Sequence, residues 1–144
     1  MSCWSDGNCV AVGSAGASLS EVAFAVVESN GSWGPTTDVA PDIENNDGGA
    51  ELTSVACSAD GTCVAGGGWT FGFSSAAVAP AFVVSESSGT WGTPTTLTSG
   101  TGLVESISCP SDGGCTAAGF DVGAFGHEQA FVADESGGSW GSAT

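Results

Sequence analysis

Apolar and polar positions alternate along this chain in short runs, separated by turns rich in glycine and serine. Runs such as residues 52–57 (LTSVAC) and 81–86 (AFVVSE) are short and rich in β-branched residues, which is typical of β-strands. No long stretch keeps the 3.6-residue apolar period of an amphipathic helix. The pattern therefore predicts an all-β protein.

Two motifs recur three times in the same order along the chain. The first, C-x-x-D-G-x-C, is followed each time by a run of small residues and stands at residues 3–9, 57–63 and 109–115. The second begins with Ala-Phe, ends with E-S-x-G-x-W-G and stands at residues 23–34, 81–92 and 130–141. These repeats predict a single β-repeat domain, residues 1–144, with three units at about residues 1–40, 50–98 and 103–144.

Each unit contains two turn signals that divide it into strands. Asp-Gly between two apolar runs is typical of a tight hairpin, because glycine tolerates the positive φ of the turn. The E-S-x-G-x-W-G segment indicates a second turn, so the central unit is expected to form strands near residues 52–57, 63–67, 81–86 and 91–97. Four antiparallel strands in about 50 residues is the size of one β-propeller blade. We therefore expect three four-stranded antiparallel blades.

The E-S-x-G-x-W-G hairpin resembles a shortened Asp-box, with Glu28, Glu86 and Glu135 in the place of the aspartate. The Asp-box is the turn between the third and fourth strands in bacterial-neuraminidase-repeat propellers. The whole unit resembles the cysteine-bearing repeats of bacterial extracellular propeller proteins. This resemblance implies that the one–two and three–four turns share one face of the molecule. It also implies that the variable loops lie on the other face, where propellers usually bind ligands.

Three blades are too few to close a propeller ring, since propellers have about four or more. Open sheet edges favour pairing with another copy of the chain. We expect a homo-oligomer in which two chains complete a six-bladed ring, or a head-to-tail filament. The alternative is that the chain is an excerpt of a larger propeller.

The six cysteines form three C-x5-C pairs, and one pair falls in each repeat. We expect one disulfide per blade: Cys3 with Cys9, Cys57 with Cys63, and Cys109 with Cys115. Zinc binding is disfavoured, because zinc motifs use closer cysteine spacings and the chain has only one histidine. Disulfides favour an oxidising setting, so the chain is expected to be secreted or extracellular, at the cell surface or in the matrix.

The charge of the chain restricts the classes of molecule that it can bind. It has no lysine or arginine and 16 acidic residues, which gives a formal net charge of −16. Nucleic acid and anionic membrane surfaces are excluded, because binding either requires cationic side chains. No apolar run is long enough for membrane insertion. Metal cations, basic proteins and neutral glycans remain as possible partners.

Aromatic residues that do not recur between units are the candidate ligand-binding residues. They fall on the expected loop face, where His127 also lies. The candidate ligand-binding residues are Trp69, Phe71, Phe73, Phe125 and His127. A sugar-stacking platform or a protein contact would use such residues, and core packing explains the aromatic ones equally well. Trp33, Trp91 and Trp140 do recur, so we expect them to be packing anchors between blades.

Two further candidate sites are weaker. Asp42, Glu44 and Asp47 could bind calcium together with Glu51, but their spacing fits no standard calcium loop and favours a solvated acidic loop. No other cofactor is expected. Asn30 stands in an Asn-Gly-Ser sequon, which makes it a candidate glycosylation site in a glycoprotein.

The residues argue against catalysis. Neuraminidases that carry Asp-boxes hold the substrate carboxylate with arginines and use a tyrosine nucleophile, and this chain has neither residue type. We therefore predict a non-catalytic extracellular structural or adhesive module that self-associates. The alternative is a lectin-like carbohydrate-binding β-propeller.

Overall fold

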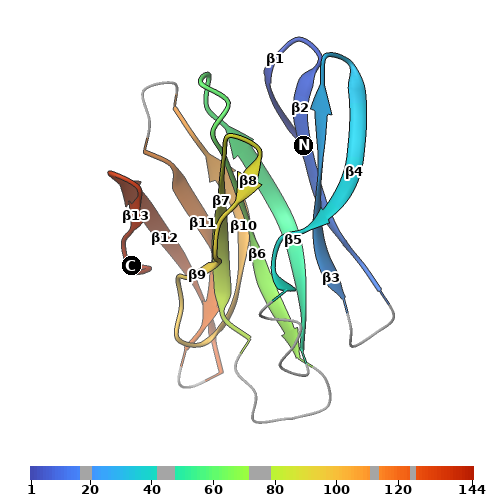
Figure 1. Ribbon diagram of the computed structural model, residues 1–144. Coiled ribbons are helices and arrows are strands. Elements are labelled where there is room, and N and C mark those ends of the chain that lie inside the picture. The colour runs from blue at the N-terminus through green and yellow to red at the C-terminus, as the bar shows by residue number, and fades with distance from the viewer. Residues whose placement is uncertain (17–20, 42–47, 72–78, 111–113, 124–125) are drawn as a thin grey trace.

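The computed structural model describes residues 1–16, 21–41, 48–71, 79–110, 114–123 and 126–144. The chain forms three antiparallel sheets that stand side by side like the blades of a propeller (Figure 1). The predicted all-β fold with three four-stranded blades is confirmed. Among the described residues, no helix is both long enough and apolar enough to cross a membrane.

Blade 1 is a four-stranded meander in which each strand pairs with the next one along the chain. Its fourth strand forms the edge of the sheet and contains Pro35, which is tolerated there because an edge strand can lack one N–H donor. The strands are β1 (Ser2–Ser5), β2 (Asn8–Ala15), β3 (Val22–Ser29) and β4 (Ser32–Asp38).

Blade 2 follows the same order, but its expected fourth strand is divided in two. Both pieces pair with β7, and Pro94 lies in the gap between them. The strands are β5 (Gly48–Cys57), β6 (Cys63–Phe71), β7 (Ala81–Ser87), β8 (Thr90–Trp91) and β9 (Thr95–Thr96).

Blade 3 repeats the meander with a short fourth strand. Its first pair carries a register shift between Val104 and Ser106, at the position equivalent to the shift between Leu52 and Ser54 in blade 2. The strands are β10 (Thr101–Ser108), β11 (Thr116–Val122), β12 (Glu128–Ser136) and β13 (Ser139–Trp140).

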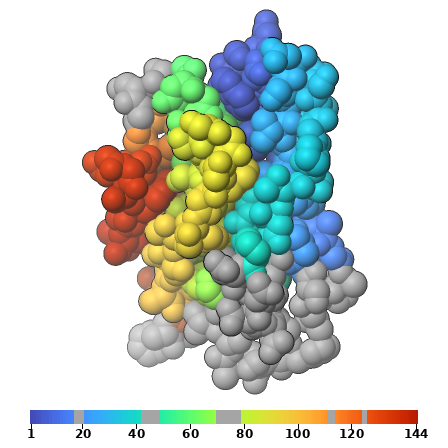
Figure 2. Space-filling view, in the orientation of Figure 1, coloured from blue at the N-terminus to red at the C-terminus, as the bar shows by residue number. Residues whose placement is uncertain are grey.

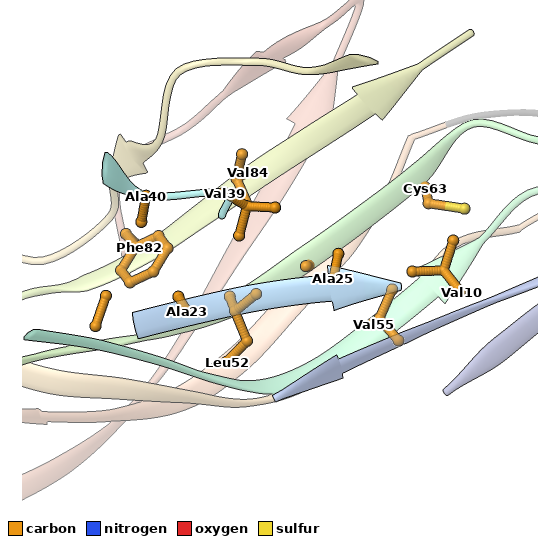
Figure 3. Packing of buried hydrophobic residues seen from close by; sticks show 12 residues of the cluster. Val10, Ala23, Ala25, Val39, Ala40, Leu52, Val55, Cys63, Phe82 and Val84 are labelled. Carbon is orange, nitrogen blue, oxygen red and sulfur yellow. The ribbon is translucent and has the colours of Figure 1, made fainter. Parts of the chain in front are cut away.

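Blade 2 is buried on both faces, because alternate residues of its strands point toward different neighbours. Phe82 and Val84 of β7 pack in a core shared with blade 1, whereas Ala81 and Val83 pack in a core shared with blade 3. Figure 3 shows Phe82 in the first of these cores with Ala23 and Ala40 of blade 1. Burying one such large side chain contributes about 1.5–3 kcal/mol, so the two inter-blade cores are the main source of stability.

The first strands of successive blades are joined by hydroxyl side chains. The Cys57 N–H donates a hydrogen bond to Ser2 Oγ at 3.0 Å, and the Ile107 N–H donates one to Ser54 Oγ at 3.0 Å. These bonds satisfy backbone donors at the inner edge of each sheet, where no neighbouring strand pairs with them. Each blade is thus fixed to the next along its first strand as well as through its core.

Candidate functional site

Each C-x-x-D-G-x-C motif forms a closed hairpin between the first and second strands of its blade. The three bonds are Cys3–Cys9, Cys57–Cys63 and Cys109–Cys115, so the prediction of one disulfide per blade is confirmed. The second cysteine of each pair is buried among core residues, whereas Cys3 is exposed. The cysteines are therefore structural in the folded chain.

The repeated aspartate organises this hairpin in blade 2. Asp60 Oδ1 accepts hydrogen bonds from the Ser58 hydroxyl at 2.6 Å and from the Thr62 N–H at 3.0 Å. These bonds stabilise the ionised carboxylate and lower the pKa of Asp60, with the Ser58 bond as the largest cause. Gly61 follows with a φ of 88°, in the left-handed region that glycine adopts without strain. The motif thus serves the turn itself.

The repeated glutamate caps the turn between the third and fourth strands. Glu86 is 5% exposed, and its Oε1 accepts a hydrogen bond from the Gly89 N–H. In blade 3, Glu135 Oε1 accepts from the Gly138 N–H at 2.9 Å and its Oε2 accepts from the Cys115 N–H at 3.2 Å. In blade 3 the glutamate therefore connects the two repeated motifs, and in blades 2 and 3 its role in the turn accounts for its recurrence.

Both kinds of turn lie at the same end of the molecule, which we call the turn end (Figure 1). In blade 1 the Gly31 N–H of one turn donates a hydrogen bond to the Gly7 carbonyl oxygen of the other at 2.9 Å. Asn30 lies on this end, is exposed, and has a φ of 51° in the turn. Its backbone N–H donates to Asn8 Oδ1 at 3.2 Å. Glycosylation of Asn30 stays a prediction.

Grooves between blades occur in matched pairs. At the turn end, a groove of about 310 Å³ between blades 1 and 2 contains Trp4, Asp60 and Glu86. Its counterpart between blades 2 and 3 has about 240 Å³ and contains Glu86 and Glu135. These grooves recur with the blades, so stacking of the sheets accounts for them. Since the sequence has no lysine or arginine, neither groove offers a guanidinium or ammonium group to an anionic ligand.

A second pair of grooves lies along the outer edges of the blades. One, of about 240 Å³, is lined by residues of blade 1 and by Trp91 and Pro94 of blade 2. The other, of about 340 Å³, is lined by Leu97 and Asp121 among others. Here too the grooves stand at equivalent places in successive blades.

The candidate ligand-binding residues are only partly placed by the structure. Trp69 is half-buried and packs against the core between blades 1 and 2. His127 is exposed, and its carbonyl oxygen accepts a hydrogen bond from the Gly123 N–H at 3.0 Å. Phe73, Phe125 and the side chain of Phe71 lie outside the described residues. Within the described part of the chain, Trp69 and His127 share neither a groove nor a core cluster.

The candidate calcium ligands Asp42, Glu44 and Asp47 also lie outside the described residues. Their neighbour Glu51 is described, and its pKa is raised by burial and, to a smaller extent, by the nearby carboxylate of Glu21. In the described ranges, no group of three or more histidine, cysteine or acidic side chains is arranged to hold a metal ion.

The recurring tryptophans differ in their surroundings. Trp91 packs against the core between blades 1 and 2, and Trp140 packs against the core between blades 2 and 3. Their role as packing anchors is confirmed. Trp33 is 48% exposed, so the same expectation is wrong for blade 1. The physical reason is that Trp33 lies on the side of blade 1 that faces away from blade 2.

Two outer faces were not foreseen as functional surfaces. The blade 1 outer face consists of Phe24, Val26 and Trp33. Phe24 and Val26 alternate along β3 with the core residues Ala23 and Ala25, so they point to the opposite side of the sheet. Trp33 of β4 pairs in register with Glu28 of β3, on the same side as Phe24 and Val26. The blade 3 outer face is the opposite end of the stack and consists of Ala118, Ala130 and Val132. Val132 is 47% exposed. The recurring Ala-Phe pair was the sequence signal for these faces, because adjacent residues of a strand point to opposite sides of the sheet.

Comparison with known proteins supports the fold. No known family profile matches the sequence, and no curated protein sequence matches it significantly. Among solved structures, a "Hadza microbial sialidase Hz136" is similar over 96% of this chain, with a TM-score of 0.73 and 12% sequence identity. The chain spans only 35% of that protein's length. At this identity the likeness is one of fold, and it agrees with a β-propeller-like arrangement of the three blades.

Proposed function

We propose that this chain is a non-catalytic, extracellular structural and adhesive module that works by self-association. The observation that carries the proposal is the contrast between the sheets: blade 2 is covered on both faces, whereas blades 1 and 3 each leave one partly apolar face exposed. Exposed apolar side chains gathered on one face are typical of surfaces that bind another protein.

The chemistry of the described grooves supports a non-catalytic role. The carboxylates of Asp60, Glu86 and Glu135 are engaged in the hydrogen bonds that shape the turns. The sequence contains neither the arginine nor the tyrosine that the resemblance to neuraminidases would require. The three disulfides favour an oxidising, extracellular location.

Measurement of the mass in solution tests this proposal. Analytical ultracentrifugation over a range of concentrations is expected to give a mass that rises above 13.9 kDa as concentration increases. Electron microscopy of the concentrated sample should then show rings or filaments. A mass of 13.9 kDa at every concentration and salt condition would rule the proposal out.

A lectin-like function is the second candidate. Support comes from the half-buried Trp69 near the variable loops and from the fold shared with a protein named a sialidase. Binding to a glycan array is expected to disappear in Trp69→Ala and to persist in Trp33→Ala, which removes a tryptophan from a different surface. An array without signal, or binding unchanged in Trp69→Ala, would exclude this candidate.

A further inference from the structure

The repeats show which residues of one blade contact the preceding blade. Phe82 and Trp91 of blade 2 pack in the core shared with blade 1, and Phe82 is fully buried. Phe131 and Trp140 stand at the same motif positions of blade 3 and pack in the core shared with blade 2. The same phenylalanine and tryptophan are therefore used at both inter-blade interfaces.

In blade 1 these two motif positions are Phe24 and Trp33, and they lie on the blade 1 outer face. Phe24 pairs in register with Gly13, as Phe82 pairs with Gly67 and Phe131 with Gly119. The local geometry of the blade is thus the same in all three copies. Trp33, which is 48% exposed, lacks the cover that its counterparts receive from a preceding blade.

The opposite end of the stack carries the matching receptor surface. In blades 1 and 2, the receiving positions on the third strand are Ala23 and Ala25, and Ala81 and Val83, all of which are buried. In blade 3 the same motif positions are Ala130 and Val132, on the blade 3 outer face. Both are exposed, and Val132 keeps 47% of its surface.

We propose that a second copy of this chain docks its blade 1 outer face onto the blade 3 outer face of the first copy, repeating the interface that the chain already contains twice. This inference rests on the proposed self-association and specifies its two faces. Such a contact is heterologous, since different surfaces of the two copies meet. Two copies would form a closed six-bladed ring if the rotation closes, and successive copies would form a filament if it does not.

Charge is expected to oppose this contact. The residue before the repeated glutamate is Val27 in blade 1, Ser85 in blade 2 and Asp134 in blade 3. Within the chain, Val27 shares a groove with Glu86, and Ser85 shares the equivalent groove with Glu135. By the same geometry, Asp134 of one copy would face Glu28 of the next.

Two carboxylates that line the same groove repel each other, and neither copy supplies a lysine or arginine to offset them. Added salt screens such repulsion. Self-association is therefore expected to strengthen with ionic strength, which is the reverse of the behaviour of contacts between opposite charges.

Two single variants test the pairing of faces. Phe24→Asp alters only the blade 1 outer face, and Val132→Asp alters only the blade 3 outer face. Each variant alone is expected to associate at least about tenfold more weakly than the parent chain, because an aromatic anchor or its pocket is lost. An equimolar mixture is expected to form dimers that grow no further, since each variant retains the face that the other lacks.

The controls separate failure of this inference from failure of the proposed function. A parent chain that stays monomeric overturns both the proposed self-association and the pairing of the two outer faces. A parent chain that assembles while both variants still assemble overturns the pairing of faces alone. So does a mixture that stays monomeric, or loss of assembly in Phe24→Asp only, which would indicate a contact between two blade 1 outer faces.

Trp33→Ser provides a second blade 1 variant if Phe24→Asp does not fold, since Trp33 is already half-exposed. Asp134→Ser, which introduces the blade 2 residue, is expected to strengthen association severalfold at low salt and to have no effect at high salt. An equal effect of Asp134→Ser at both salt concentrations would contradict the predicted opposition of Asp134 and Glu28.

Discussion

Several glycines in this protein occupy positions where the backbone leaves no room for a side chain. Gly67 and Gly119 stand opposite Phe82 and Phe131 in the sheets. A methyl group added at Gly67 would overlap the carbonyl oxygen of Glu51, and one added at Gly119 would overlap that of Leu103. In blades 2 and 3, the glycine that ends the small-residue run is thus required by the close approach of the first strand.

Substitution of these glycines tests that requirement. Gly67→Ala and Gly119→Ala are each expected to lower the free energy of unfolding by about 1–3 kcal/mol, because the strands must separate to admit the methyl group. Gly141→Ala is the matched control, since its added carbon would meet the Asp134 carbonyl oxygen at an ordinary 3.5 Å. Equal melting temperatures for all three variants would contradict the role assigned to Gly67 and Gly119.

Asp60 provides a test of pH dependence at a single residue. Its pKa is lowered in the folded chain from the ordinary value of 3.8, chiefly by the Ser58 hydroxyl. A lowered pKa stabilises the folded state at pH values above 3.8, and that contribution is lost as the pH falls through the folded pKa. The parent chain should therefore be slightly more stable than Asp60→Asn at neutral pH, and the difference should shrink in acid.

Chemical denaturation at several pH values measures this difference. Ser58→Ala is expected to reduce the dependence, because it removes the largest cause of the pKa shift. A stability difference between the parent and Asp60→Asn that is the same at neutral and acid pH would show that the carboxylate charge has no part in the turn.

At the scale of the element, the disulfide hairpins differ in how deeply they are buried. The second cysteines, Cys9 and Cys63, are both buried, but the first cysteine is half-buried against the core in blade 2 (Cys57) and exposed in blade 1 (Cys3). Replacing Cys57 and Cys63 together with alanine is expected to cost about 2 kcal/mol from the loss of loop closure. It should also cost more than the same change at Cys3 and Cys9, because it removes sulfur atoms from the core.

Thermal melts of the two double variants compare these costs. Titration with a reductant gives an independent measurement, in which the Cys3–Cys9 bond is expected to be reduced before Cys57–Cys63, because Cys3 is exposed and Cys57 is half-buried. Reduction in the opposite order would show that burial does not control access to these bonds.

The predicted elements agree with the structure where a local signal determined them. The Asp-Gly turns, the hairpin cysteines and the continuous apolar run at 81–86 all specify a strand or turn within a few residues. The division of the fourth strand at Pro94 was not predicted, because the same region of blade 1 tolerates Pro35 in an unbroken strand. Proline alone does not distinguish these two outcomes.

The exposure of Trp33 could not be predicted from its motif. All three tryptophans occur in the same local sequence, and only the order of the blades in space decides which of them is covered. The surroundings of Trp69 and His127 could not be predicted either, because a residue that does not recur has no counterpart within the chain for comparison.

At the scale of the whole molecule, the three blades lie side by side in chain order (Figure 2), and among the described residues only the middle blade is buried on both faces. Phe82→Ala is expected to lower the free energy of unfolding by about 3–5 kcal/mol, because it leaves a cavity in an inter-blade core. Phe24→Ala removes the same side chain from the blade 1 outer face and should cost much less in the monomer. If both variants lost a similar free energy of unfolding in dilute solution, Phe24 would have to be as deeply buried as Phe82, which would contradict an exposed blade 1 outer face.

The disulfides have a consequence for how such a chain can change in length. Each bond joins cysteines only six positions apart, and none connects one repeat to another. A gene duplication or deletion of a whole repeat would therefore add or remove a complete crosslink and leave no cysteine without its mate. In every repeat, oxidative folding would only have to join two cysteines that are close in sequence. Variants with more or fewer repeats should therefore form their disulfides as readily as this chain.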